Sequence, residues 1–165
     1  FNTTASSGPN NYVYALALSG TNLYVGGAFT SYRTDSKGYR LAKVDTTTGD
    51  LDTTNFNTTA SSGPNNYVYA LAISGSSLYV GGGFGTYRGN NKGLYLAKVD
   101  TTTGALDTTN FNTAASSGPN DTVFALALSG TNLYVGGTFS SYRANSTDGA
   151  ACTSVNATTG VIDLP

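Results

Sequence analysis

The sequence contains no histidine, methionine, tryptophan, glutamate or glutamine, and only 10% of its 165 residues are charged. Methionine, glutamate and glutamine are strong helix formers, whereas the threonine, glycine, asparagine, serine and tyrosine that dominate this chain favour strands and turns. The composition therefore predicts an all-β protein. The length is that of one ordinary domain.

The missing residues also limit the function. Lysine and arginine are scattered and the net charge is -1, so there is no basic footprint for nucleic acid. Without histidine or glutamate, general acid-base chemistry would fall on aspartate alone, and no two aspartates recur in a spacing that suggests a paired site. We therefore expect no enzymatic activity, no cofactor and no nucleic-acid partner.

Cysteine and long apolar runs are scarce as well. Cys152 is the single cysteine, so no intrachain disulfide or cysteine-based metal site is possible, and we expect a small buried apolar residue. No apolar run approaches the roughly 20 residues of a membrane-spanning helix, so we expect no membrane insertion. Few charges and abundant threonine, serine and asparagine favour a secreted or cell-surface location. Glycosylation sequons lean the same way, at Asn2, Asn57, Asn145 and Asn156.

What is present is a repeat. The chain divides into three units of 55 residues, 1–55, 56–110 and 111–165, and the first two units match at 43 of 55 positions. The stretches LYVGGAFTSYR, LYVGGGFGTYR and LYVGGTFSSYR begin at Leu23, Leu78 and Leu133. A period of this kind is typical of solenoids, propellers and arrays, in which one unit cannot bury its apolar faces alone. Function must therefore belong to the assembled repeat.

Each unit is predicted to form four strands. In residues 12–20, YVYALALSG, alternation places a small set and a bulky set of side chains on opposite faces of a strand. The small set is Val13, Ala15 and Ala17, and the bulky set is Tyr14, Leu16 and Leu18. The turn SGTN leads to the strand LYVGG, LAKVD at 41–45 is a third strand, and DLDTT after TTTG begins a fourth. The result is an antiparallel meander.

A meander repeated in this way fits a β-propeller, in which such sheets pack face to face around an axis, with about 4 to 8 blades as the usual number. A β-helix is the other candidate, but its rungs are typically shorter. Small residues on the first strand suit the crowded axis of a propeller. We therefore predict an all-β β-propeller with three four-stranded blades per chain.

The repeats resemble a known family. The run from LDTTNFNTTASSGPNNYVYALA through LYVGG.F to LAKVDTTTG.LDTT is similar to the delta-60 repeat of bacterial β-propellers, in which an LD..F segment precedes a V.A strand, an L.VGG.F strand and an LA.vd..G.LD hairpin. The resemblance covers nearly the whole chain. The kelch repeat is a weaker match, because the tryptophan that closes a kelch blade is absent. The delta-60 resemblance implies a propeller in a secreted or surface-exposed bacterial protein, and it implies no catalytic residues.

Glycine pairs end the second predicted strand of each unit. A phosphate-binding loop would need a following helix and lysine, which are absent here. Glycine in a strand more often marks a bulge or a close approach of two backbones. We interpret the pairs as the places where a blade edge meets its neighbour. They are Gly26-Gly27, Gly81-Gly82 and Gly136-Gly137.

The VDTTTG turns raise a question of metal binding. Asp45, Asp50 and Asp52 are weak calcium candidates. An aspartate that opens a tight turn ending in glycine commonly binds its own backbone instead, and we favour this interpretation.

Long polar loops repeat on one predicted face of the ring, and loops on a rigid scaffold are where binding residues concentrate. A planar ring beside a guanidinium and amides suits recognition of a sugar or peptide. The alternative is that the tyrosines pack beneath the loops and the arginines cap backbone carbonyls. The candidate residues are the pairs Tyr32-Arg33, Tyr87-Arg88 and Tyr142-Arg143, with Asn10, Asn11, Asn65 and Asn66.

Three blades make only part of a ring, so a lone chain would expose an apolar face at each end. Apolar burial is worth about 25 cal/mol per Å², and we expect the chain to associate with itself head to tail. Two chains give a six-bladed ring, which we favour; a nine-bladed trimer, an open filament or a fragment of a longer chain are the alternatives. The function is then a structural or adhesive module, and the alternative is a lectin-like multivalent binder of glycan or peptide.

The third unit departs from the pattern after Arg143, with one extra residue before its TTG turn. Cys152 then takes the place of Leu41 and Leu96, and Val155 that of Val44. Terminal repeats are often atypical because their neighbours differ. We expect its third and fourth strands to survive with looser packing and with Cys152 buried.

Overall fold

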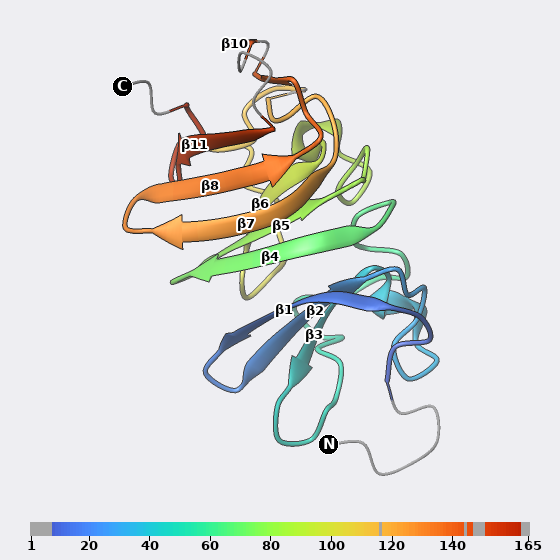
Figure 1. The fold of residues 1–165 in the computed structure, drawn as a ribbon. Helices are drawn as coiled ribbons and strands as arrows, with labels where there is room; N and C mark the ends of the chain where they lie inside the picture. Colours follow the sequence, from blue (N-terminus) through green and yellow to red (C-terminus); the bar gives the residue numbers. More distant parts are fainter. Residues whose placement is uncertain (1–7, 116, 144, 147–150, 163–165) are drawn as a thin grey trace.

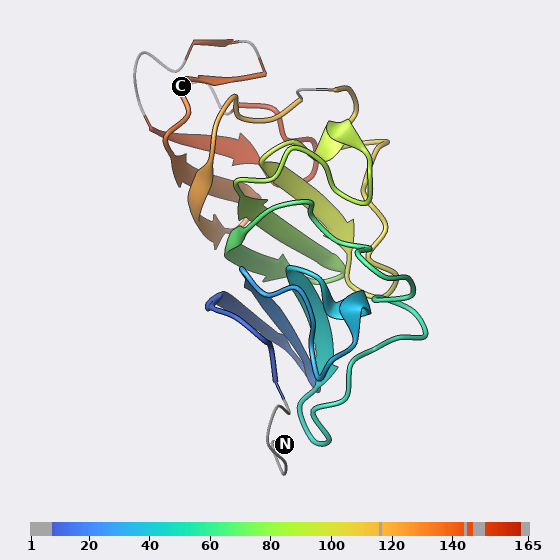
Figure 2. The ribbon, with the colours of Figure 1, turned by 90° about the vertical axis from the view of Figure 1, so that its right-hand side faces the viewer.

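The computed structural model describes residues 8–115, 117–143, 145–146 and 151–162. These residues form three antiparallel three-stranded sheets, one in each unit, with two short 3-10 turns as the helical content. The sheets are stacked face to face in chain order, with the first and third at opposite ends of the stack (Figures 1 and 2). The prediction of an all-β repeat fold is confirmed.

The three sheets have the same plan, in which the second strand is central. The first sheet contains β1 (Val13–Ser19), β2 (Asn22–Gly27) and β3 (Leu41–Asp45), and the second contains β4 (Val68–Ser74), β5 (Ser77–Gly82) and β6 (Leu96–Asp100). The third contains β7 (Val123–Ser129), β8 (Asn132–Gly137) and β11 (Cys152–Asn156). The smaller elements are η1 (Ser36–Gly38), η2 (Asn91–Gly93), β9 (Ser141–Tyr142) and β10 (Asn145–Ser146).

The predicted fourth strand is reduced to a single bridge in every unit. In the first unit Val44 pairs with Leu51, and the flanking bonds join Asp45 N to Asp50 O and Asp52 N to Lys43 O. The carboxylate of Asp52 then accepts bonds from the next backbone amides along the chain, which turns the chain away from the sheet. The prediction of four full strands is therefore wrong, because this turn ends the pairing after one bridge.

A bulge in the first strand of each sheet changes which face its valine occupies. The register of β4 against β5 shifts between Val68 and Ala70. As a result Val68 and Leu71 both face Gly26 of the preceding sheet. Simple alternation had placed the valine on the face of the small alanines, and this prediction is wrong because the bulge adds one residue between them.

The apolar cores lie between the sheets. The first core joins Tyr24 and Leu41 of the first sheet to Val68 and Leu78 of the second, and all four side chains are almost completely buried. The second core has equivalent membership between the second and third sheets. Each sheet therefore depends on its neighbour for burial, as expected of a repeat that cannot fold alone.

Glycine allows the sheets to approach closely. A Cβ atom on Gly26 would lie 2.5 Å from Cγ1 of Val68, and one on Gly81 would lie 2.6 Å from Cγ1 of Val123. Valine is stiff about χ1 and cannot move aside. The interpretation of the first glycine of each pair as a point of close approach agrees with this geometry.

Polar contacts also cross each boundary between units. The hydroxyl of Tyr24 donates to the carbonyl of Thr101 at 2.8 Å, and that of Tyr79 donates to the carbonyl of Ala157 at 2.6 Å. A phenolic hydroxyl rarely stays unpaired when its ring is buried. These two equivalent bonds fix how one sheet sits on the next.

A buried asparagine ties each unit to the one before it. Asn57 is 1% exposed, and its side chain accepts from the amide of Lys43 and donates to the carbonyls of Lys37 and Leu41. Asn112 makes the same three contacts one unit later. A glycan on the Asn57 sequon would displace these bonds, so this sequon is structural in the folded protein. Of the other sequons, Asn2 lies outside the described residues.

We predict that Gly81→Ala destabilises the fold, because the added methyl would overlap Val123 across the second boundary. Overpacking of this kind costs about 1–3 kcal/mol, and urea unfolding followed by circular dichroism measures it. Gly85→Ala is the matched control, since only the side-chain amide of Asn65 would lie within 4 Å of its Cβ, at 3.8 Å. Equal midpoints for the two variants would contradict the close-approach role.

Candidate functional site

The three tyrosines of the candidate loops lie in the core. Tyr32, Tyr87 and Tyr142 are 2%, 0% and 0% exposed. The hydroxyl of Tyr32 donates to the carbonyl of Gly49 at 3.1 Å, and that of Tyr87 donates to the carbonyl of Gly104 at 3.0 Å. Their ring faces are therefore covered by protein and do not meet a ligand in solvent.

The arginines beside them bind backbone carbonyls. Nε of Arg88 donates to Ser62 at 2.9 Å, Nη1 donates to Thr103 at 3.0 Å, and Nη2 donates to Phe56. Arg143 makes equivalent bonds in the third unit. Each guanidinium thus joins the segment that enters its unit to the turn after the third strand.

Arg33 of the first unit binds the turn after its third strand as well. It forms an ion pair with Asp50 at 2.6 Å and donates to the carbonyl of Thr48 at 3.1 Å. Exposed ion pairs contribute little to stability, so the pair with Asp50 adds little to the hold of this loop.

The asparagines of the candidate set cap the same loops. The side-chain oxygen of Asn65 accepts from the amides of Gly85 and Thr86, at 2.8 and 3.0 Å, and Asn10 makes the corresponding bonds. Asn11 and Asn66 each accept from the amide of the following residue. The geometry is that of the alternative interpretation, in which these loops are held by internal packing and capping.

The three calcium candidates have separate partners. Asp45 accepts from the amides of Thr47 and Thr48 at 2.8 and 2.9 Å, and these bonds, led by Thr48, lower the pKa of its carboxyl. Asp50 pairs with Arg33, and Asp52 pairs with a lysine ammonium. Across the described ranges no group of three or more His, Cys, Asp or Glu residues gathers in one place. Asp45 thus has the turn geometry that we favoured.

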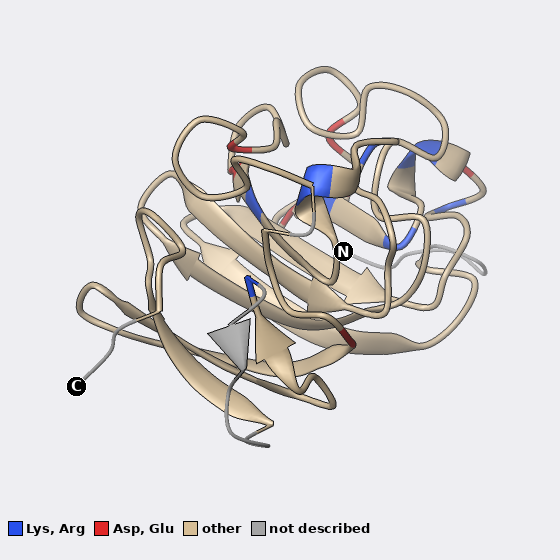
Figure 3. Cartoon of the chain, turned by 90° about the horizontal axis from the view of Figure 1, so that it is seen from above, with Lys and Arg blue, Asp and Glu red and all other residues tan. Residues whose placement is uncertain are grey.

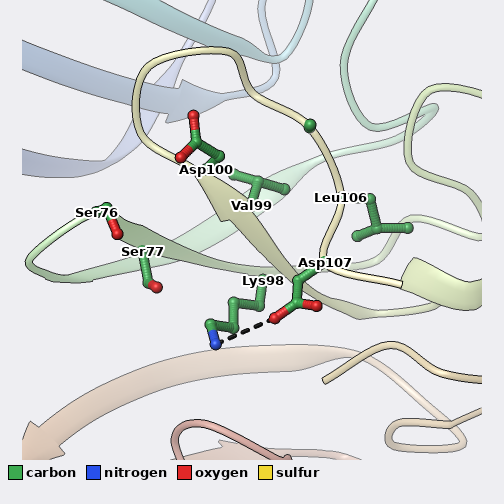
Figure 4. Close-up of a pocket in the computed structure, with 8 residues that line it drawn as sticks. Ser76, Ser77, Lys98, Val99, Asp100, Leu106 and Asp107 are labelled. Atoms are coloured by element: carbon green, nitrogen blue, oxygen red, sulfur yellow. Dashed lines mark ion pairs between the residues drawn. The ribbon is translucent and has the colours of Figure 1, made fainter. Parts of the chain in front are cut away.

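A pocket of about 360 Å³ lies beside β6, at the side of the second sheet (Figure 4). Lys98 spans it, with its ammonium 3.2 Å from Asp107 and 3.4 Å from the carbonyl of Thr158 in the next unit. The residues that line the pocket are Ser76, Ser77, Lys98, Val99, Asp100, Ala105, Leu106 and Asp107. The sequence analysis did not predict the ion pair of Lys98 and Asp107. The signal was available, because the lysine of LAKVD is followed by the aspartate of LDTT in the first two units.

The carboxylates of this pocket are not proton donors near neutral pH. Burial alone would raise the pKa of Asp107, but bonds from the Asn110 amide and from Lys98 outweigh it and lower that pKa. The pKa of Asp100 is also lowered, because amide bonds from its own turn outweigh the effect of burial. Both groups are therefore ionised, Asp107 in an ion pair with Lys98 and Asp100 as the acceptor of amides of its own turn.

Among the described residues, two surfaces remain without the partners that their internal counterparts have. We define the head face as Val13, Tyr14, Leu16 and Leu18, on β1. Val13, Leu16 and Leu18 are 42%, 60% and 62% exposed. Their counterparts on β4, Val68, Leu71 and Ile73, pack into the first inter-sheet core.

The opposite surface is the tail face, defined as Ala125, Ala127, Tyr134, Gly136 and Cys152. Tyr134 is 42% exposed, whereas Tyr24 and Tyr79 at the same position are 1% and 3% exposed. Cys152 is exposed, so the prediction of a buried cysteine is wrong. Cys152 pairs with Gly136 as Leu41 pairs with Gly26, and it lacks only the next sheet that covers those leucines.

Both end faces lack charge. The strands that carry them, β1, β7, β8 and β11, contain no charged residue, and the blue and red segments of the ribbon in Figure 3 lie mainly in the connecting loops. An aromatic row also runs between the two faces, with Tyr14 and Tyr69 centroids 5.3 Å apart and Tyr69 and Phe124 centroids 5.2 Å apart. The rings at the two ends of the row, Tyr14 and Phe124, are 45% and 50% exposed.

Comparisons with known proteins bear on the fold alone. No family model and no curated protein matches the chain. Among solved structures, the computationally designed protein Ika4 superposes with a TM-score of 0.58 at 16% identity over 97% of this chain and 75% of its own. The computationally designed protein Ika8 gives a TM-score of 0.55 at 17% identity over 91% of this chain. This chain spans 35% of Ika8.

The helical content also bears on whether a helix of this chain could cross a membrane. Within the described part of the chain, no helix has the length and apolar character needed to cross a bilayer.

We predict that Tyr87→Ala strongly destabilises the fold, by about 3–5 kcal/mol, because it leaves a cavity in the first inter-sheet core. Tyr87→Phe is the matched variant, which keeps the ring and removes only the bond to Gly104, at about 1 kcal/mol. Urea unfolding measures both. If the Tyr87→Ala variant were as stable as the parent, the packing role of Tyr87 would be wrong, and Tyr87 would again be a candidate ligand-binding residue.

We also predict a loss of stability in alkaline solution. Burial, partly offset by Arg88, raises the pKa of Tyr87 to about 12, whereas an unfolded tyrosine ionises near about 10. The folded state therefore retains a proton that the unfolded state loses, so this contribution is complete below about pH 10 and falls as the pH rises towards 12. Thermal unfolding from pH 8 to 11.5 should show this decline, with a shallower slope for Tyr87→Phe.

Proposed function

We propose that this chain is a non-enzymatic structural module of an extracellular or cell-surface assembly, which completes a β-propeller by associating head to tail with further copies of itself. One observation carries the proposal: the head and tail faces expose the same apolar positions that the two internal boundaries bury. The few charges and the polar, threonine-rich composition support a location outside the cell.

Energetics favour a second copy as the partner of these faces. Each leucine of the head face gains part of the about 1.5–3 kcal/mol of full burial, since its counterparts Leu71 and Ile73 are partly buried. Neither face contains a charge that would have to be desolvated. The internal boundaries supply a contact of matching shape, already made twice within the chain. Because the two faces differ, their contact is heterologous and closes into a ring if the rotation permits.

The number of copies follows from the number of sheets. With three sheets per chain, two copies give a six-bladed ring, inside the usual range of about 4 to 8 blades. Three copies give nine blades, beyond that range, and an association that fails to close gives a filament. We favour the six-bladed ring. The likeness to delta-60 propellers remains an expectation from the sequence that accords with this assembly.

The alternative function, a lectin-like binder acting through the Tyr-Arg loops, has less support. Stacking on a sugar requires an accessible ring face, and the three loop tyrosines are buried. Their arginine and asparagine neighbours are engaged with backbone groups. The loops therefore act in this proposal as the rigid edge of the module.

We predict that light scattering of the chain at micromolar concentration gives twice the chain mass of 16.9 kDa. The double variant Leu16→Asp and Leu18→Asp should be a folded monomer, because the docked head face would have to desolvate two carboxylates. The matched control, Thr58→Asp and Ala60→Asp, adds the same charge on an exposed loop and should stay dimeric. A stable monomer of the parent chain would overturn the proposal.

A further inference from the structure

The contact between copies can be specified residue by residue, because the two internal boundaries are close copies of each other. We infer that the joint between the tail face of one copy and the head face of the next repeats the internal boundary in register. Val13 then sits on Gly136, the hydroxyl of Tyr134 donates to the carbonyl of Thr46, and Cys152 lies against Gly8. This inference rests on the proposed self-association and adds its geometry.

The first element is the glycine and valine contact. Val68 and Val123 are completely buried, each against the first glycine of the preceding glycine pair. Val13 is 42% exposed, and no described atom of a neighbouring sheet lies against Gly136: the nearest described atom to its Cβ would be Cβ of Ala125, at 3.6 Å. Val13 therefore lacks the glycine that its counterparts contact, and Gly136 lacks the valine that its counterparts contact. The two residues lie at opposite ends of the stack.

The second element is a hydrogen bond. At each internal boundary a tyrosine of the central strand donates to a carbonyl just after the third strand of the next sheet. Thr101 is the acceptor in the second unit, and Thr46 is its counterpart in the first. Tyr134 is 42% exposed and has the donor position. In the joint its hydroxyl meets the Thr46 carbonyl of the other copy.

The third element places a native thiol at the joint. A Cβ on Gly63 would lie 3.8 Å from Cβ of Leu41 and 2.6 Å from the carbonyl oxygen of Tyr39. One on Gly118 would lie 3.9 Å from Cβ of Leu96 and 3.1 Å from the carbonyl oxygen of Leu94. Cys152 has the position of these leucines in the third sheet, and Gly8 is the first-unit counterpart of the two glycines. Disulfides span Cβ separations of about 3.5–4.5 Å. A cysteine at position 8 would therefore meet Cys152 of the other copy at bonding distance, once the entering segment shifts slightly away from the carbonyl that Gly63 and Gly118 approach.

Gly8→Cys tests the register through cross-linking. With oxidised glutathione as the acceptor of the two electrons released when the thiols join, we expect covalent dimers on non-reducing gels that revert on reduction. Ala60→Cys, on an exposed loop, controls for chance collision, and Gly8→Cys with Cys152→Ser should give no dimer through this joint. A ladder of higher bands would show an open chain of copies in the same register, which supports the joint but overturns the closed ring.

Gly136→Ala tests the same joint without a cysteine. Its methyl makes an ordinary contact within the chain, so the fold and its urea midpoint should be kept in a background that cannot associate, Leu16→Asp with Leu18→Asp. In the otherwise native chain, the methyl occupies the site of Val13, and self-association should weaken by about tenfold or more. Tyr134→Phe, which loses one hydrogen bond, should weaken it by about fivefold.

The outcomes separate the two proposals. A parent chain that is dimeric by light scattering, yet neither cross-links through position 8 nor responds to Gly136→Ala, overturns the register and leaves self-association standing. A parent chain that is monomeric overturns both. Cross-linking together with a response to Gly136→Ala establishes the register.

Discussion

The contact of a valine with a strand glycine of the preceding unit is the constraint on which this structure depends. Val68 lies on Gly26 and Val123 lies on Gly81, each so close that a single methyl on the glycine would overlap the valine. A bulge in the first strand turns the valine towards that glycine. Because the sheets approach so closely there, the leucines and tyrosines around the contact can form a continuous core between sheets.

Polar groups at the same boundaries make the stacking specific. Apolar burial is non-directional, and alone it would allow one sheet to slide over the next. The tyrosine hydroxyls that donate to a carbonyl of the next unit and the buried asparagines that clasp the third strand of the preceding one allow one position only. Leaving any of these buried groups unpaired would cost its full desolvation, so the repeat distance of the stack is fixed.

The internal bonding of polar groups also explains why the Tyr-Arg loops are a poor ligand site. The tyrosine, arginine and asparagine side chains that recur in them are spent on holding the loops and the entry to each unit. The surfaces with unmet potential are the two ends of the stack, where one more sheet would complete the core. The end faces are uncharged and differ from each other. They therefore suit head-to-tail contact between identical chains better than head-to-head or tail-to-tail contact.

The sequence by itself determined the all-β class, the three units, the strands of each hairpin and the meaning of the first glycine of each pair, because period and alternation are local properties of the chain. It could not determine the face of Val13, since a bulge reverses alternation within one residue, nor the length of the fourth strand, which a turn at Asp52 ends. It also misplaced Cys152, which occupies a core position that no described residue covers. Burial is decided by what lies on the other side of a strand, and only the tertiary structure supplies that neighbour.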